Sequence, residues 1–350
     1  MPKPVADQVV VITGASSGIG RATALAFARA GAEVVAAART VQALDSLVAE
    51  VTAGGGKALA VPTDVAEPEQ VYALADAAER RFGRIDTWVN NAAVAVWGRV
   101  EDITDEEFDR VLRVNFLGQV YGVHAALPAL RRAGGGVVIG VASVEGVRAV
   151  PMHAPYTASK WALRAFYDSL RMELAEEGAP IAVTTILPAS IDTPFFEHAR
   201  SKLGAMAKPP PPVYAPETVA EAIVTASTSP TREVPVGGSA VGFLAGQRFS
   251  PALADALMSL RRVAVRAQTS DRPDNGIDNV DRPVDEPGRV HGRYSGRVLQ
   301  HSALTSLLGH RRRPGEVLGS ALTAARGRAG VAGAGAERPR ATGSGTGADG

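Results

Sequence analysis

Short apolar runs alternate with longer amphipathic stretches over about the first 240 residues. Several runs are apolar at every position, which is typical of strands covered by helices on both faces. Strands that alternate with helices predict βαβ units, and therefore an α/β fold with a doubly wound parallel sheet. The predicted strands are 8–12, 33–37, 57–61, 85–89, 136–142, 181–187 and 233–236, and the predicted helices are 18–30, 41–53, 68–82, 105–132, 156–177 and 216–228.

Two breaks interrupt this alternation and suggest the domain organisation. Residues 194–216 contain a run of four prolines, which continues neither a helix nor a central strand, so we expect a functional flap there. From about residue 266 arginine, aspartate, glycine and proline dominate. We therefore predict a catalytic domain over 1–240, an apolar or amphipathic helix over 241–265, and an extension over 266–350 that is largely disordered toward its end. The predicted helix would pack on the domain, on a partner subunit or on a membrane surface.

The composition narrows the class of protein. Hydrophobic residues make up 46% of the 350 residues and charged residues 21%, as in globular domains, and a net charge of +1 gives no reason to expect a nucleic-acid partner. The absence of cysteine excludes disulfides, thiolate chemistry and cysteine-ligated metals, and we predict no metal site. No run reaches the roughly 18 apolar residues of a membrane span, and the N-terminus does not resemble a signal peptide. We expect a cytoplasmic protein.

Three glycines follow the first predicted strand directly. Gly14, Gly18 and Gly20 lie between this strand and a helix, in the spacing G-x-x-x-G-x-G. Glycines there allow a tight turn and a close approach of the backbone to a pyrophosphate, which the helix N-terminus also attracts. A glycine-rich turn alone is a weak signal, but its position at the start of a βαβ series favours a dinucleotide site over a purely structural turn.

The end of the second predicted strand indicates which dinucleotide is bound. Sites that prefer NAD usually carry an acid there, which holds the ribose 2′-hydroxyl. Here Ala38 stands at that position, Arg39 follows, and Glu33 lies too early to substitute. A guanidinium suits a 2′-phosphate, so we expect NADP rather than NAD; the alternative is that Arg39 is a solvated surface residue.

Tyr156 and Lys160 lie four residues apart and would share one face of a helix. Alone, this spacing is better explained by an exposed helical turn that carries one aromatic side chain and one solvated cation. The context is more specific, because six motifs occur in the same order as in the short-chain dehydrogenase/reductase family, which the chain resembles over about residues 5–240. These motifs are TGASSGIG (13–20), NNAA (90–93), Asn115 within RVNFLG, Ser143, YTASK (156–160) and PASIDT (188–193).

The resemblance implies a Rossmann-type sheet of about seven strands in the order 3-2-1-4-5-6-7, and a catalytic set. Tyr156 would be the acid/base, Ser143 would hold the substrate oxygen, and Asn115 would hold a water of the proton relay. Lys160 would bind the nicotinamide ribose. A tyrosine titrates near pH 10, so we expect the ammonium of Lys160 and the positive nicotinamide of the oxidised cofactor together to lower the pKa of Tyr156 toward neutrality.

The resemblance also implies a wider cofactor site. Alanine stands at positions 93 and 189, where the family usually has glycine, so the geometry of these two loops should differ slightly. The residues implied to bind the cofactor are Gly14, Ser16, Ser17, Gly18, Ile19, Gly20, Arg39, Asp64, Val65, Asn91, Ala92, Ala93, Val114, Tyr156, Lys160, Pro188, Ile191 and Thr193.

The flap supplies mostly apolar side chains, so we expect a hydrophobic or aromatic carbonyl or alcohol as substrate. His153 and Arg148 are expected to face solvent. The leading hypothesis is an NADP-dependent oxidoreductase that acts on CH–OH donors; the alternatives are a non-catalytic NADP-binding regulator and a membrane-associated, lipid-modifying reductase. The predicted helix 156–177 is apolar on more than one face, and in the resembled family it commonly forms a dimer seam, so we expect a homodimer or a homotetramer.

Overall fold

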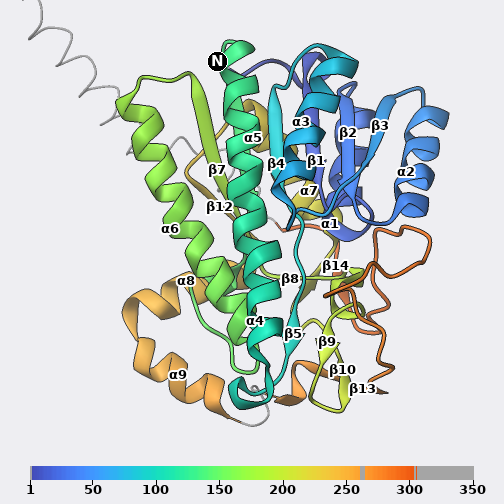
Figure 1. Cartoon of the computed structure of the whole chain (residues 1–350). Coiled ribbons are helices and arrows are strands. Elements are labelled where there is room, and N and C mark those ends of the chain that lie inside the picture. The colour runs from blue at the N-terminus through green and yellow to red at the C-terminus, as the bar shows by residue number, and fades with distance from the viewer. Residues whose placement is uncertain (1, 261–264, 303–304, 306–350) are drawn as a thin grey trace, which may run out of the picture. The chain divides into compact units, whose positions relative to one another are not determined.

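Seven apolar runs pair as one parallel sheet in the computed structural model of the chain, which describes residues 2–260, 265–302 and 305. The order β3-β2-β1-β4-β6-β7-β12 confirms the predicted order of the seven predicted strands (Figure 1). The strands are β1 (Val9–Thr13), β2 (Glu33–Ala38), β3 (Lys57–Pro62), β4 (Thr87–Asn90), β6 (Gly136–Val141), β7 (Ile181–Pro188) and β12 (Glu233–Val236).

The residues of β1 show why these strands are apolar throughout. Val9 and Val11 belong to the core on one face of the sheet, and Val10 and Ile12 belong to the core on the other face. All four are almost completely buried, because helices cover both faces. One face is covered by α3 (Pro68–Phe82), α5 (Gly118–Arg132) and α6 (Ala154–Glu176), and the other by α1 (Gly18–Arg29), α2 (Val41–Ala53) and α7 (Pro216–Thr228).

The predicted helix 105–132 is divided into three parts. The helix α4 (Asp105–Leu112) begins at a capping box, in which Thr104 and Glu107 each accept a hydrogen bond from the other's backbone N–H. A π-helical turn, Arg113–Leu117, then leads into α5. Such a turn changes the helical repeat only locally and is frequent at functional sites, and here it contains Asn115.

The segment 241–265, predicted as one helix, contains most of two helices, α8 (Gly238–Phe249) and α9 (Pro251–Ser259). Pro251 begins α9, because proline fits the first turn of a helix but cannot continue one. Arg148 fastens both helices to the domain: it donates to Gln247 at 2.9 Å and pairs with Asp255. The apolar side chains Phe249, Leu253, Leu257 and Leu260 are exposed.

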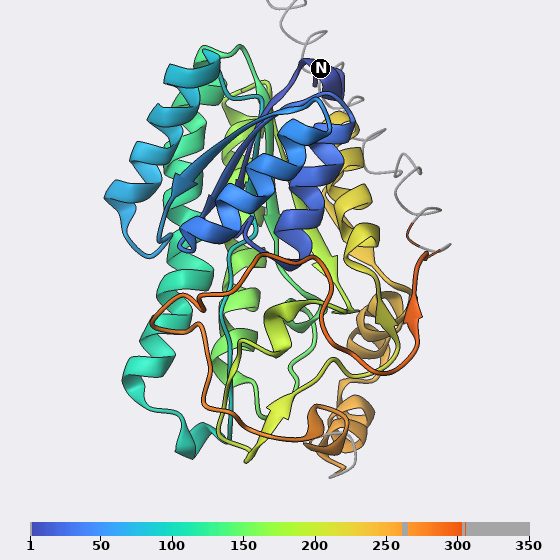
Figure 2. The ribbon, with the colours of Figure 1, turned by 90° about the vertical axis from the view of Figure 1, so that its right-hand side faces the viewer.

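Residues 266–302, the first part of the predicted extension, pack against the domain. The strand β13 (Thr269–Pro273) pairs with β10 (Ala205–Ala207), and β14 (Val298–Leu299) pairs with β11 (Val213–Tyr214). In Figure 2 the orange segment crosses the front of the molecule below the blue N-terminal helices. The disorder predicted for the last thirty residues falls outside the described part of the chain. The remaining short strands are β5 (Val96–Trp97), β8 (Ser190–Ile191) and β9 (Arg200–Ser201).

No helix in residues 2–260 or 265–302 is long and apolar enough to cross a membrane.

Candidate active site

The turn between β1 and α1 forms a cradle that only glycine can build. Gly14 and Gly18 have φ values of +67° and +54°, in the left-handed region that disfavours other residues. At Gly20, a Cβ atom would lie 2.1 Å from the carbonyl oxygen of Gly14 and 2.6 Å from Nδ2 of Asn91. The turn therefore lies directly against the first turn of α1, whose N–H groups point toward the carboxyl edge of the sheet.

Arg39 lies at the end of β2, beside the cradle. Its guanidinium donates to the carbonyl oxygens of Asn279 and Asp281. Burial lowers the pKa of Arg39, and the carboxylates of Asp64 and Asp281 only partly oppose this effect. Burial also disfavours the ionised form of Asp64, but hydrogen bonds from Arg110, at 2.7 Å, and from the backbone of Ala66 outweigh it and hold the pKa of Asp64 below its usual value. A guanidinium keeps its charge in proteins even where burial lowers its pKa, so Arg39 offers a positive charge beside the cradle.

Ser143, Tyr156 and Lys160 converge at the other end of the same crevice. Ser143 follows β6, whereas Tyr156 and Lys160 occupy successive turns at the start of α6. The Nζ atom of Lys160 donates to the carbonyl oxygen of Val141 at 2.9 Å and lies 5.3 Å from the centre of the Tyr156 ring. Ser143 also shares a side-chain hydrogen bond with Tyr156. The structure therefore brings the three predicted catalytic side chains together.

The side chains around Tyr156 shift its pKa upward, whereas Lys160 and a bound oxidised cofactor together are expected to lower it. Burial raises the pKa of Tyr156 above its usual value, the Glu145 carboxylate raises it further, and the bond with Ser143 only partly compensates. Lys160 is also buried, and burial lowers its pKa to about 7. Desolvation is the largest cause of both shifts, and it affects the two partners at once. The polypeptide by itself therefore keeps the phenol protonated at neutral pH.

The buried ammonium should make folding stability depend on pH. Because the unfolded pKa of Lys160 is near 10.5 and the folded value is about 7, the unfolded chain binds more protons between these values. Lys160 thus penalises the fold fully below about pH 7, and the penalty fades as pH rises. We expect Lys160→Met to gain stability relative to wild type at about pH 6 compared with about pH 9, by roughly 3 kcal/mol. Urea unfolding at the two pH values measures this; an equal difference at both would contradict it.

Asn115 lies behind this group and is completely buried. Its Oδ1 atom accepts from the backbone N–H of Val94 at 2.8 Å, and its Nδ2 atom donates to the carbonyl oxygen of Val94 and to Ser159. The side chain of Asn115 thus connects the π-helical turn to the loop that follows β4 and to α6. Its role in a proton relay remains a prediction.

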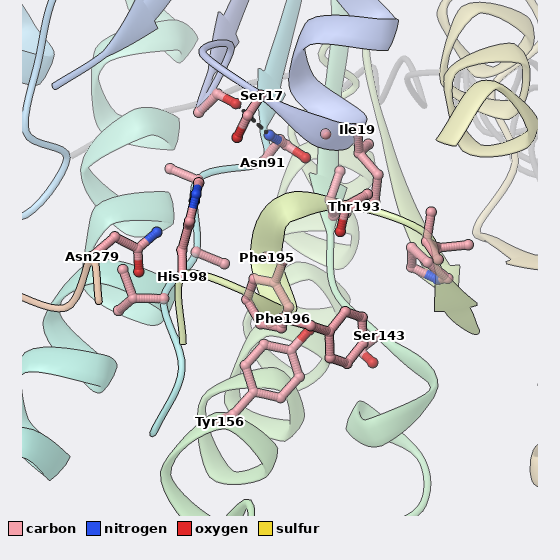
Figure 3. A pocket seen from close by; sticks show the side chains of 18 of the residues that line it. Ser17, Ile19, Asn91, Ser143, Tyr156, Thr193, Phe195, Phe196, His198 and Asn279 are labelled. Carbon is pink, nitrogen blue, oxygen red and sulfur yellow. Dashed lines mark hydrogen bonds between the residues drawn. The ribbon is translucent and has the colours of Figure 1, made fainter. Parts of the chain in front are cut away.

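One cavity of about 300 Å³ runs between the two ends (Figure 3). Ser17, Ile19 and Asn91 lie at one end in the figure, and Ser143 and Tyr156 lie at the other. Every residue predicted to bind the cofactor lines this cavity except Gly20, which lies behind the cradle. The glycine cradle, the cation at Arg39 and the elongated cavity fit a dinucleotide. In residues 2–260 and 265–302, no three histidine, aspartate or glutamate side chains are placed to hold a metal ion.

The sequence model described as short chain dehydrogenase matches residues 8–204, more than half of the chain. The chain belongs to this family. The oxidoreductase YxnA of Bacillus subtilis, named as uncharacterized, is 43% identical over 275 residues, which cover 78% of this chain and 77% of YxnA. This short-chain dehydrogenase is therefore an oxidoreductase, like the relatives that it matches.

Solved short-chain dehydrogenases share the fold. A Burkholderia phymatum enzyme in complex with NAD superposes with a TM-score of 0.64 and is 27% identical, covering 73% of this chain and 96% of its own. The L-sorbose reductase of Gluconobacter frateurii, in complex with NADPH and L-sorbose, gives a TM-score of 0.61 at 28% identity, covering 68% of this chain and 98% of its own. Relatives of this short-chain dehydrogenase thus bind either dinucleotide.

A cluster beside Tyr156 was not anticipated from the sequence. His153 is 1% exposed, not solvent-facing as expected, because its ring lies between Tyr156, with ring centres 4.4 Å apart, and Trp97, at 3.8 Å. Its Nδ1 atom lies 3.0 Å from the carboxylate of Glu145, which also accepts from Thr157 at 2.9 Å. The sequence carries only one indication of this cluster: His153 precedes Tyr156 by three residues, which is close to one helical turn, so the two rings could lie on the same side.

Arg148 was also expected to face solvent, and it is 6% exposed because α8 and α9 cover it. Of the apolar side chains of the flap, Phe195 and Phe196 line the cavity, and other segments add Val94, Trp97, Val144 and Val150. Phe243 of α8 and residues of the segment 279–288 line it as well, and no local motif marks either of them.

Proposed function

We propose that this short-chain dehydrogenase is an NADP-preferring oxidoreductase that interconverts a carbonyl and an alcohol. One observation carries the proposal: Ser143, Tyr156 and Lys160 meet at one end of a cavity whose other end is the glycine cradle. A dinucleotide-binding regulator would need the cradle but not these three side chains together.

Each proposed role follows from the position of the side chain. A bound nicotinamide dinucleotide would supply or accept the hydride. The hydroxyl of Tyr156, kept protonated by burial, would donate its proton to the carbonyl oxygen of the substrate. Ser143 would hydrogen-bond the same oxygen and stabilise its developing charge. Lys160 would hold the dinucleotide ribose and, through Asn115 and a water, restore the proton of Tyr156.

The substrate proposed here is a small apolar or aromatic carbonyl compound. Trp97, Phe195 and Phe196 form a mutually packed aromatic group beside Tyr156, with ring-centre distances from 5.5 to 5.8 Å. Such walls favour apolar groups, and the few polar atoms of the site orient the reacting oxygen.

A panel of ketones and aldehydes, mixed with NADPH and followed by its absorbance, tests the activity. Steady turnover on apolar or aromatic carbonyls is the expected result. Tight binding of NADPH without turnover on any carbonyl would instead favour the regulator.

Arg39 should determine the preference for NADP. Charge-assisted hydrogen bonds to a 2′-phosphate would be lost in Arg39→Ala, so we expect the affinity for NADPH to fall by about 10- to 100-fold and that for NADH by less than about threefold. Titration of each dinucleotide by fluorescence measures both. Arg29→Ala, which removes an exposed arginine at the far end of α1, is the control for net charge. Equal losses for both dinucleotides would contradict the assignment.

An assembly of two or four chains stays part of the proposal. Trp161 and Met172 on α6 are 43% and 65% exposed, and these apolar side chains support a subunit contact along that helix.

A further inference from the structure

Residues 278–293, which we call the strap, cross the cavity from outside the family match. The chain before the strap is anchored by the pairing of β13 with β10, and the chain after it by the pairing of β14 with β11. The strap is therefore fixed at both ends while its middle has no regular secondary structure. Such a segment can open without unfolding the sheet.

One side of the strap is seated on the dinucleotide-binding half of the domain. The carbonyl oxygens of Asn279 and Asp281 accept from Arg39, the residue proposed to select the cofactor. The carbonyl oxygen of Arg289 accepts from the N–H of Gly18 at 2.9 Å, at the first residue of α1. The strap thus contacts both the predicted adenosine position and the cradle.

The other side is seated on the flap. The carboxylate of Asp278 accepts from Arg200 at 2.9 Å, and Arg289 pairs with Glu197 at the same distance. Between these points the side chain of Val280 is completely buried, and Arg110 donates to its carbonyl oxygen at 3.0 Å. The strap therefore connects the dinucleotide-binding half of the domain to the flap.

The strap and the cradle line the same cavity. Ser16, Ser17, Gly18 and Arg39 line it from the domain; the strap residues that line it are Asn279, Pro283, Val284, Glu286, Pro287 and Gly288. A ligand in this half of the cavity would be covered by the strap.

We propose that the strap is a wall of the dinucleotide site, which encloses the adenosine and pyrophosphate half of the cofactor and has to open for the cofactor to exchange. The inference rests on the proposed function. The strap is held by hydrogen bonds and ion pairs to the domain on one side and to the flap on the other. Removing some of these contacts should therefore increase the dissociation rate of the dinucleotide more than it changes the association rate.

The kinetic test uses the full chain. The double variant Asp278→Ala/Gly292→Ala removes one of the two strap carboxylates that pair with Arg200, the other being Asp281, and crowds the contact with Asp192, where a Cβ at Gly292 would lie 2.7 Å from Oδ1. Neither residue lines the cavity. Asp285→Ala is the matched control, because it removes an exposed strap carboxylate for which the structure shows no side-chain contact. Stopped-flow displacement of NADPH by excess NADP measures the dissociation rate.

We expect the double variant to release NADPH about tenfold faster than wild type, and the control to stay within about twofold. Unchanged rates would overturn the proposal, and so would tighter binding, since tighter binding would make the strap a competitor of the cofactor. If neither NADPH nor NADH binds the wild-type chain, both the proposed function and the strap's role fail. Binding with unchanged rates in the double variant refutes the strap alone.

Limited proteolysis of the wild-type chain gives a second measurement that needs no variant. Trypsin can cut the strap after Arg289 and Arg293, and its cleavage after Arg132, at the end of α5, serves as the internal reference. We expect saturating NADPH to slow cleavage of the strap about tenfold relative to the reference. Equal or faster cleavage of the strap would overturn the proposal.

Discussion

Tyr156→Phe is expected to reduce kcat for carbonyl reduction by about 1,000-fold, because it removes only the hydroxyl that would donate the proton. The ring stacks on His153 and packs against Phe195, and these contacts survive in phenylalanine. Stability should therefore change little. Affinity for NADPH should also be retained, because Lys160 keeps its hydrogen bond to Val141 and thus its position.

The measurement is kcat under saturating NADPH and carbonyl substrate, with binding of NADPH followed separately. Tyr72→Phe, which removes a hydroxyl from a tyrosine 41% exposed on α3, is the matched control and should leave kcat unchanged. Retention of more than about a tenth of the activity in Tyr156→Phe would exclude the phenol as the proton donor.

Gly20→Ala is expected to distort the glycine turn, because the added methyl group would clash with the backbone of Gly14. The added methyl group would lie 2.1 Å from the backbone carbonyl oxygen of Gly14, which directly follows β1, and Gly20 itself lies in the first turn of α1. Either the turn or the start of α1 has to move. We expect the dissociation constant for NADPH to rise at least about 100-fold, and the free energy of unfolding to fall by about 1 to 3 kcal/mol.

Gly242→Ala in α8 tests whether the damage comes from this contact or from adding a methyl group to any helical glycine. No atom lies within 4 Å of a Cβ at Gly242, so the change should leave NADPH binding intact and stabilise α8 by up to about 1 kcal/mol. Fluorescence titration and thermal unfolding of both variants make the comparison. Wild-type affinity in Gly20→Ala would show that the cradle does not hold the dinucleotide.

The sheet could be predicted from the sequence because its strands carry a local signal. Val9 to Ile12 are apolar at consecutive positions, and only burial on both faces accounts for that. The π-helical turn at Asn115 could not be predicted, because one wide turn hardly disturbs the apolar periodicity of the helices around it. The predicted helix 241–265 became two for a reason visible in the sequence, the proline at 251.

The candidate site was predictable where a motif gathers several residues on one element or at one strand end. Gly14 and Tyr156 are examples, since each belongs to a short pattern with a chemical explanation. Val280 and Asn279 are not, because the strap has no periodicity and is placed by contacts with residues 78 or more positions away. The upward shift that burial imposes on the pKa of Tyr156 could not be predicted either, since burial depends on packing rather than on spacing.

The position of Trp97 should make its intrinsic fluorescence sensitive to what binds in the cavity. The chain has three tryptophans: Trp88 is sealed within the sheet, Trp161 is 43% exposed on α6, and Trp97 borders the cavity while stacking on His153. A dihydronicotinamide entering that space would lie near a single indole and quench its emission by energy transfer. With the other two tryptophans replaced by phenylalanine, the arrival and departure of each reactant could be timed without attaching a dye.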